Sequence, residues 1–100
     1  MARTIHHPPV EALELTAVLH ALSDPVRLEI VRLLAAEPDG RRCGDCAHSV
    51  TKSTRTHHFR VLRESGVIEQ RSEGTALLNR LRRDELDARF PGLLSSVLSA

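Results

Sequence analysis

Hydrophobic positions near the start of the chain recur with the period of an α-helix. Between Val10 and Leu22 they fall at steps of one to three residues and are Leu13, Leu15, Val18, Leu19 and Leu22. They cover more than one face, so we expect a helix that is buried against two neighbours. Two prolines at positions 8 and 9 stop any helix before it. Residues 1–9 are therefore predicted to form a flexible N-terminal arm.

A second helix is predicted from Val26 to Ala36. Ser23, Asp24 and Pro25 form a typical helix start, with a capping side chain followed by proline at the first helical position. The turn-forming residues 37–40 end this helix. A short third helix is expected over residues 44–49, followed by a tight turn at position 50.

The segment from Thr51 to Gly66 has the most distinctive pattern in the chain. Thr51 is a candidate N-cap, and Gly66 stands where a left-handed residue ends a helix. Phe59 and Leu62 share one face by their three-residue spacing, and His58 falls nearer this inner face, where a hydrogen-bonded structural histidine is expected. The opposite face carries hydroxyl, imidazole and guanidinium groups and has no carboxylate before position 64; it comprises Ser53, Thr56, His57 and Arg60. A helix of this kind fits the major groove of duplex DNA.

A β-hairpin is predicted directly after this helix. Residues 67–71 and 76–81 read as strands, and residues 72–75 read as a glycine-containing turn. Arg71, Arg80, Arg82 and Arg83 lie on or beside the hairpin, from which they can reach phosphates. A recognition helix followed by a hairpin is the element order of a winged helix-turn-helix.

The C-terminal segment, from Asp84 to Leu98, is predicted to be a helix interrupted around residues 90–92. Its apolar stripe suits pairing with the same helix of a second chain. The predicted fold is therefore mainly α with a small β-hairpin wing (α+β), a homodimeric winged helix-turn-helix. Residues 10–100 are expected to form the DNA-binding domain.

Charge is distributed unevenly, although the net charge is only +1. Residues 41–83 carry ten basic and four acidic side chains, whereas the segments before and after them are both acidic. Positive charge is thus confined to the segment predicted to meet DNA. The chain has two aromatic residues, too few for a single-strand stacking platform. It has no apolar run of membrane-spanning length and no signal-peptide core, so we expect no membrane partner and a cytoplasmic location.

Two motifs closely resemble the ArsR/SmtB family of bacterial transcription regulators. They run from His20 to Leu34 (HALSDPVRLEIVRLL) and from Lys52 to Val67 (KSTRTHHFRVLRESGV). The resemblance spans about residues 12–83. It implies a homodimeric repressor that binds a palindromic operator and is modulated by a small inducer, often a metal ion. It also implies a dimer interface made by the first and last helices.

The sequence departs from the family pattern at three places, one of which is the loop between the third helix and Thr51, about two residues shorter than in the commonest metal-sensing members. Arg55 stands where the family usually has Val or Leu, and helical spacing puts it near the buried side of Phe59, from which it is expected to snorkel outward to a phosphate. Asn79 replaces a frequent Tyr on the second strand of the wing, which predicts a less firmly packed wing.

Candidate metal ligands come from the N-terminal half of the chain. They are Cys43, Cys46 and His48, together with His6 and His7 of the arm. Thiolate and imidazole groups at this spacing suit Zn²⁺ or Ni²⁺. No His follows position 58, so the family's other frequent site, on the last helix, is expected to be missing. The opposing interpretation makes Cys46 a small core residue, and it is the one that we favour.

Two other function classes are disfavoured. The sequence has neither a Gly-x-Ser-x-Gly elbow nor a glycine-rich phosphate loop, and Cys43–Cys46 lacks the strand–helix setting of a redox motif, so we expect no enzyme. A winged helix used only for protein contact would show apolar anchors on the outer face of the Thr51 helix, whereas this face carries the polar side chains named above.

The sequence therefore predicts a DNA-binding transcription regulator. We expect it to be a dimeric repressor without a required cofactor. The alternative is a nickel- or zinc-responsive transcription sensor, a class of regulator that can also act as an activator. The predicted DNA contacts are Lys52, Ser53, Arg55, Thr56, His57, Arg60, Arg71 and Arg80.

Overall fold

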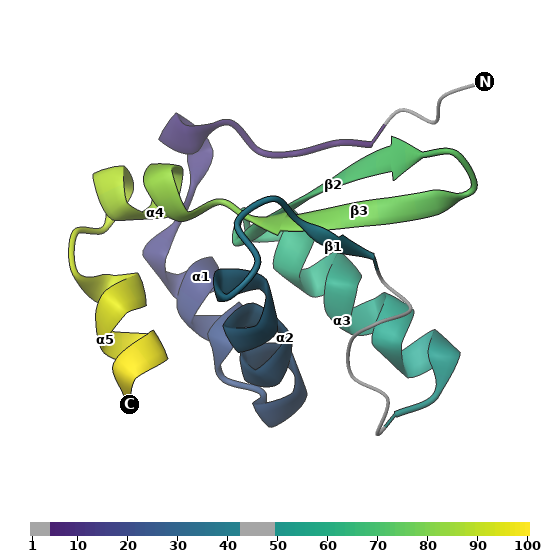
Figure 1. The fold of residues 1–100 in the computed structure, drawn as a ribbon. Coiled ribbons are helices and arrows are strands. Elements are labelled where there is room, and N and C mark those ends of the chain that lie inside the picture. The colour runs from purple at the N-terminus through teal and green to yellow at the C-terminus, as the bar shows by residue number, and fades with distance from the viewer. Residues whose placement is uncertain (1–4, 43–49) are drawn as a thin grey trace.

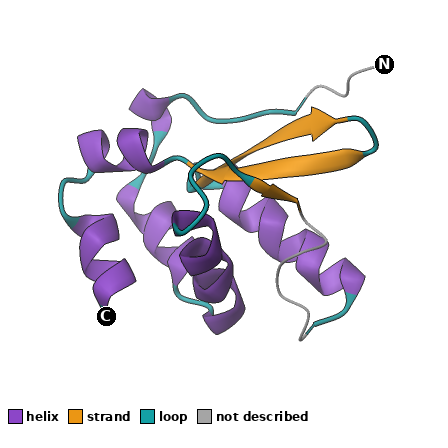
Figure 2. Cartoon of the chain, viewed as in Figure 1, coloured by secondary structure: helices purple, strands orange, loops and turns teal. Residues whose placement is uncertain are grey.

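The computed structural model describes residues 5–42 and 50–100. A small sheet and its hairpin occupy one end of the molecule, and the C-terminal helices occupy the other (Figure 1). Helices dominate and the sheet is antiparallel, as Figure 2 shows. The elements in chain order are the 3-10 helix η1 (Val10–Ala12), α1 (Leu15–Leu22), α2 (Pro25–Ala35), β1 (Arg41–Arg42), α3 (Lys52–Glu64), β2 (Ile68–Glu73), β3 (Ala76–Leu81), α4 (Arg83–Arg89) and α5 (Leu93–Ser99).

The first helical region differs from the prediction of one helix over residues 10–22. It consists of η1, an extended break and the shorter α1. Leu13 lies in the break with φ −69° and ψ 129°, and its side chain is buried in the core. The break lets this side chain turn inward, whereas Leu15 and Leu19 on α1 stay about half exposed.

Both predicted helix starts are confirmed. The Asp24 carboxylate accepts hydrogen bonds from the backbone amides of Val26 (2.8 Å) and Arg27 (3.1 Å), and Pro25 occupies the first turn. The amide of Arg27, with that of Val26, lowers the pKa of Asp24. At α3, the Thr51 hydroxyl accepts from the backbone amide of Thr54 at 3.2 Å.

The predicted stop of α3 is also confirmed. Gly66 has φ +87°, and two hydrogen bonds close the turn: the amide of Val67 donates to the Leu62 carbonyl, and the amide of Gly66 donates to the Arg63 carbonyl, both at about 3.0 Å. This arrangement reverses the chain and leads it straight into β2.

The sheet has one more strand than the sequence predicted. Its order is β1-β3-β2, and the unpredicted β1 pairs with β3. A strand of two residues is too short to leave a periodic pattern, which explains why it was missed. The hairpin is also longer than predicted, because Glu73 pairs with Ala76 across a two-residue turn.

The C-terminal helix is interrupted as predicted, with α4 and α5 joined through Gly92 at φ +82°. The core is formed by the apolar side chain of Leu13, next to η1, and by apolar side chains from α1, α2, α3, the sheet and the two C-terminal helices. The expected helix over residues 44–49 lies outside the described residues. Among the helices of residues 5–42 and 50–100, none is long and apolar enough to cross a membrane.

Candidate nucleic-acid interface

The outer face of α3 is exposed along its length. Lys52, Ser53, Thr56, His57 and Arg60 are all exposed there, as the sequence predicted. The Thr56 hydroxyl donates to the Lys52 carbonyl at 3.0 Å, which leaves its oxygen free to accept. The face thus offers two cations, hydroxyl groups and an imidazole, a set that complements phosphates and the acceptor groups of base edges.

The inner face of α3 anchors the helix in the core. Phe59 and Leu62 are buried, and so is His58. The separation of His57 outward from His58 inward is therefore confirmed. Arg55 lies between the two faces and is half-buried, in keeping with a long side chain whose stem covers apolar surface.

The arginines of the hairpin divide into two groups. Arg71 is exposed on β2 and is the one best placed to act from the wing. Arg80 is also exposed, but it lies near the base of the hairpin, with Nη2 2.8 Å from a Glu69 carboxylate oxygen. Arg80 thus forms an exposed ion pair away from the hairpin turn at Gly74, and its contact with DNA stays a prediction.

Arg82 does not serve the wing at all, contrary to the sequence-based suggestion. Its side chain is 5% exposed and pairs with Glu85 at 2.6 Å. Its Nη1 also donates to the Pro8 carbonyl at 2.8 Å. Arg82 is therefore a structural cation that joins the N-terminal segment to α4.

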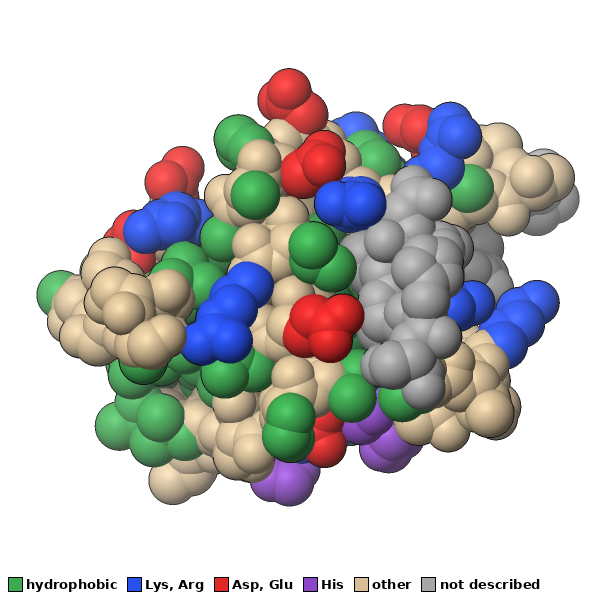
Figure 3. Space-filling view, turned by 60° about the horizontal axis from the view of Figure 1, so that its bottom comes forward, with side chains coloured by type: hydrophobic (Ala, Val, Ile, Leu, Met, Phe, Trp, Pro, Cys, Tyr) green, Lys and Arg blue, Asp and Glu red, His purple; other side chains and the backbone are tan. Residues whose placement is uncertain are grey.

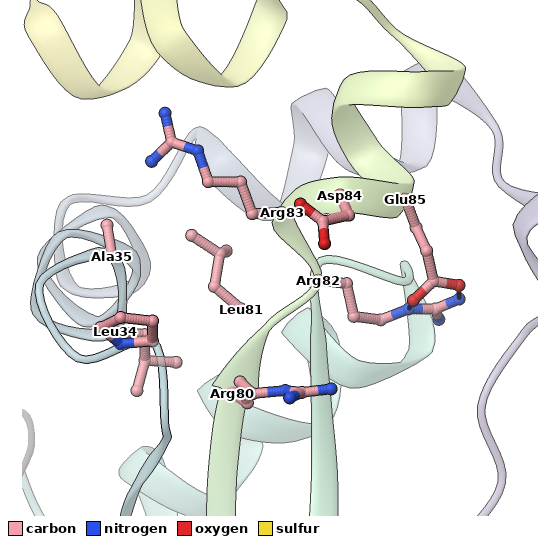
Figure 4. Close-up of a pocket in the computed structure, with 9 residues that line it drawn as sticks. Leu34, Ala35, Arg80, Leu81, Arg82, Arg83, Asp84 and Glu85 are labelled. Atoms are coloured by element: carbon pink, nitrogen blue, oxygen red, sulfur yellow. Dashed lines mark hydrogen bonds and ion pairs between the residues drawn. The ribbon is translucent and has the colours of Figure 1, made fainter.

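A hollow of about 250 Å³ lies between α2, the end of β3 and the start of α4. Figure 4 shows Arg82 and Glu85 facing each other on one side of β3, with Leu34 and Ala35 on the other side. Arg83 has a carboxylate oxygen of Asp87 within 3.7 Å. The cations around this hollow are thus held by carboxylates of the chain itself.

A buried polar network ties the wing to α3. Arg63 Nη1 donates to Gln70 Oε1 at 3.0 Å, and Gln70 Nε2 donates to Asn79 Oδ1 at 2.8 Å. Asn79 Nδ2 in turn donates to the Arg41 carbonyl at 3.1 Å. The prediction that Asn79 loosens the wing is wrong, because its amide links all three strands.

The N-terminal segment lies along β2, the outer strand of the sheet (Figure 1). His7 Nε2 accepts from the backbone amide of Gln70 at 2.9 Å. Burial, and then the nearby Arg82 guanidinium, lower the pKa of His7, which favours the neutral ring that can accept. Residues 5–9 are thus docked on the sheet, where a flexible arm was predicted.

In this position Nε2 of His7 is occupied by the Gln70 amide and is not available to a metal ion. His6 is exposed, and Cys43, Cys46 and His48 lie outside the described residues. Within residues 5–42 and 50–100, no three His, Cys, Asp or Glu side chains are grouped to hold a metal ion. The metal-sensor alternative gains no support.

Comparison with known proteins bears on this interface directly. A family model described as a helix-turn-helix domain matches residues 22–71, which run from the end of α1 into β2 and include all of α3. A protein of Bacillus subtilis (strain 168), described as the uncharacterized HTH-type transcriptional regulator YceK, is 32% identical over 82 residues, 80% of this chain and 82% of the relative.

The chain belongs to the helix-turn-helix transcription regulators. Its fold also resembles the crystal structure of the transcriptional repressor BigR from Xylella fastidiosa, with a TM-score of 0.60 and 27% identity over 75% of this chain and 84% of that one. The regulator has the mainly helical, winged form that was predicted. The relatives found are regulators of transcription and not enzymes.

Sequence reasoning missed several residues that hold this interface together. Arg27, Arg63 and Gln70 are buried or partly buried, and each joins α3 or the wing to another element. Their signals were weak, because a polar residue in a helical or strand pattern is normally exposed. The available signal was helical spacing, since Arg27 stands three residues before Ile30 and Arg63 stands four residues after Phe59, each on an apolar face.

Proposed function

We propose that this regulator is a homodimeric repressor of the ArsR type that binds duplex operator DNA through α3 and its wing. One observation carries the proposal: the exposed face of α3 presents Lys52, Ser53, Thr56, His57 and Arg60, with no carboxylate among them. A helix face of this composition matches the donor and acceptor pattern of the major groove and the phosphates beside it. A small inducer, not identified by these residues, is expected to modulate binding.

The side chains fall into two roles in this proposal. His57 and Arg60 project from the middle of α3 and read base edges, since a guanidinium can bond a guanine with two hydrogen bonds. Lys52 and Ser53, at the start of the helix, bind phosphates. Arg71 adds a phosphate contact from the wing, which supplies affinity without sequence information.

Homodimerisation is supported by apolar side chains that the chain leaves uncovered. Leu15 and Leu19, one turn apart on α1, are 46% and 44% exposed. Hydrophobic side chains also gather at the lower left of Figure 3, on the side where α5 ends the chain in Figure 1. A second copy of these helices would cover them and would place two α3 helices to read two half-sites.

The proposal is tested by comparing Arg60→Ala with Arg71→Ala in binding to operator and to random duplex DNA. Arg60→Ala should weaken operator binding by about 1–3 kcal/mol more than it weakens random binding, because it removes a base contact. Arg71→Ala should weaken binding to operator and to random DNA alike. It should also reduce the slope of log affinity against log salt concentration by about one.

Glu64→Ala is a matched control, because Glu64 is exposed at the end of the same helix. Fluorescence anisotropy at several salt concentrations measures all three variants, with an operator selected from random duplexes. If the wild type selects no duplex sequence, or if both Arg variants bind as the wild type does, the assigned face is wrong.

A further inference from the structure

Arg27 of α2 is a buried cation whose partners all lie on other elements of the helical core. Its Nε donates to the Ala21 carbonyl at 2.8 Å, and its Nη2 donates to the His20 carbonyl at 3.2 Å. These carbonyls belong to the last turn of α1, where helix carbonyls need partners and cations are favoured. Arg27 thus fastens α2 to the end of α1.

The same guanidinium reaches the recognition helix α3. Arg27 Nη1 lies 3.2 Å from Nδ1 of His58, which is buried on the inner face of α3. A guanidinium can only donate, so Nδ1 must accept and the ring proton must be on Nε2. That nitrogen lies 4.0 Å from the carboxylate of Asp24, the cap of α2. His58 is therefore held between Asp24, the cap of α2, and Arg27 in the first turn of that helix.

These contacts supply a directional restraint that the apolar core lacks. Phe59 and Leu62 pack α3 into the core, but hydrophobic burial is non-directional and tolerates small shifts of one helix on another. Hydrogen bonds depend steeply on distance and angle, and the planar guanidinium fixes several of them at once. The contact with His58 therefore sets the rotation and the axial position of α3 relative to α1.

We propose that Arg27 and His58 are positioning residues that determine which half-site spacing the dimer accepts. The inference rests on the proposed function. In the proposed dimer, α1 carries the contact between protomers and α3 reads the DNA. The separation of the two recognition helices then depends on how rigidly each α3 is held on its own α1. Beside the direct packing of these two helices, a hydrogen-bonded link between them runs through the Arg27 guanidinium.

The geometry of DNA makes spacing a sensitive readout. Inserting one base pair increases the distance between the half-sites by about 3.4 Å. It also turns one half-site relative to the other by about 36°, since a helical turn has about 10 base pairs. A rigid dimer cannot follow both changes without bending the DNA or losing contacts. A dimer with loosened recognition helices can follow them, so it discriminates less between spacings.

The test compares His58→Asn with His58→Leu in the full-length dimer. Asn keeps an acceptor close to the position of Nδ1, whereas Leu fills a similar space without one. Each protein is titrated with the selected operator, with the same operator lengthened or shortened by one base pair between half-sites, and with a single half-site. Sedimentation and thermal melting establish that each variant is a folded dimer.

We expect the wild type and His58→Asn to prefer one spacing by about tenfold or more, the scale of losing one base contact. His58→Leu should narrow this preference to about threefold or less while binding the single half-site as the wild type does. Arg27→Lys should behave like His58→Leu, because an ammonium cannot span the two carbonyls and the imidazole.

Three outcomes would overturn the inference: a wild type without spacing preference, a folded His58→Leu dimer with an unchanged preference, or an equal loss on single and paired half-sites. If His58→Leu does not fold, His58→Gln replaces it, because its carbonyl lies nearer the position of Nε2 and away from Arg27. A wild type that selects no duplex at all would instead contradict the proposed function. The two failures are therefore distinguishable.

Discussion

At the scale of single residues, the ion pair between Arg82 and Glu85 shows how one side chain can join distant parts of the chain. Arg82 is buried and also holds the Pro8 carbonyl, so its charge depends on Glu85 for neutralisation. A buried cation that loses its carboxylate costs more than the pair itself contributes. Glu85 is therefore more important to stability than its exposed position suggests.

Replacing Glu85 with Gln should lower the free energy of unfolding at pH 7 by about 1–2 kcal/mol, measured by urea denaturation. This is the lower part of the range for hydrogen bonds to charged groups, because the Glu85 side chain is 43% exposed. Glu69→Gln is the control, since its partner Arg80 is itself exposed, and it should cost less than about 0.5 kcal/mol. Equal losses of unfolding free energy in the two variants would show that the burial of Arg82 does not make its ion pair more important.

The loss caused by Glu85→Gln should depend on pH with a definite sign. The hydrogen bond from Arg82 lowers the pKa of Glu85 from its ordinary value of 4.5. The stabilisation is thus present above that value and is lost as the pH falls through the lower pKa of the folded state. Wild type and variant should therefore converge in stability as the pH falls below 4.5 and through the lower pKa of the folded state. A difference in stability that does not decrease on acidification, down to the pH at which the wild type unfolds, would show that charge is not its cause.

Residue roles were predictable where helical geometry alone decides them. Steps of 100° separated exposed His57 from buried His58, and the structure agrees. Arg27 and Arg82 were not predictable in this way, because a long guanidinium side chain reaches partners that only the tertiary fold brings near. The roles of the exposed side chains in binding DNA remain predictions.

At the scale of elements, the end of α3 depends on Gly66. Its φ of +87° is costly for any residue with a Cβ, and a Cβ built there would lie 2.0 Å from Leu13 Cδ2. Leu13 is buried and has little room to move. The buried side chain from the break between η1 and α1 thus packs directly against the stop of α3.

Gly66→Ala should destabilise the protein by about 2–4 kcal/mol, the sum of backbone strain and overpacking. Gly74→Ala is a matched control, because Gly74 also has positive φ (+63°) but nothing lies within 4 Å of its Cβ position. It should cost only the strain, about 1–2 kcal/mol. Urea denaturation of both variants measures the difference; similar losses would mean that contact with Leu13 contributes little.

The ends of elements were predictable where caps mark them, as Asp24 and Thr51 do. Two features were not. The break at Leu13 contains no proline or glycine that would mark it in the sequence, because it results from the burial of one side chain. Strand β1 exists only because β3 offers it an edge, and no local pattern of two residues can indicate that.

At the scale of the whole molecule, the exposed leucines of α1 test the proposed dimer. Each of Leu15 and Leu19 is nearly half exposed, so covering it contributes about 1 kcal/mol, or about 4 kcal/mol for the four in a dimer. Leu15→Glu/Leu19→Glu should therefore raise the dimer dissociation constant about a thousandfold or more. Sedimentation equilibrium without DNA measures this change.

A control for added charge is Thr75→Glu at the hairpin turn, which is exposed and remote from the proposed interface. It should leave the dissociation constant unchanged. A double variant of α1 that remains a tight dimer would place the interface elsewhere. A folded monomer, in contrast, would show that the helical core does not need its partner.

The docked N-terminal segment has a consequence for the behaviour of the protein in concentrated solution. Of the two outer strands of the sheet, β1 is only two residues long, and β2 has its Gln70 amide taken by His7. An open strand edge invites pairing with another molecule, and proteins commonly protect such edges. Shortening the chain at its start would uncover β2 and favour edge-to-edge aggregation, even though every residue of the recognition helix would remain intact.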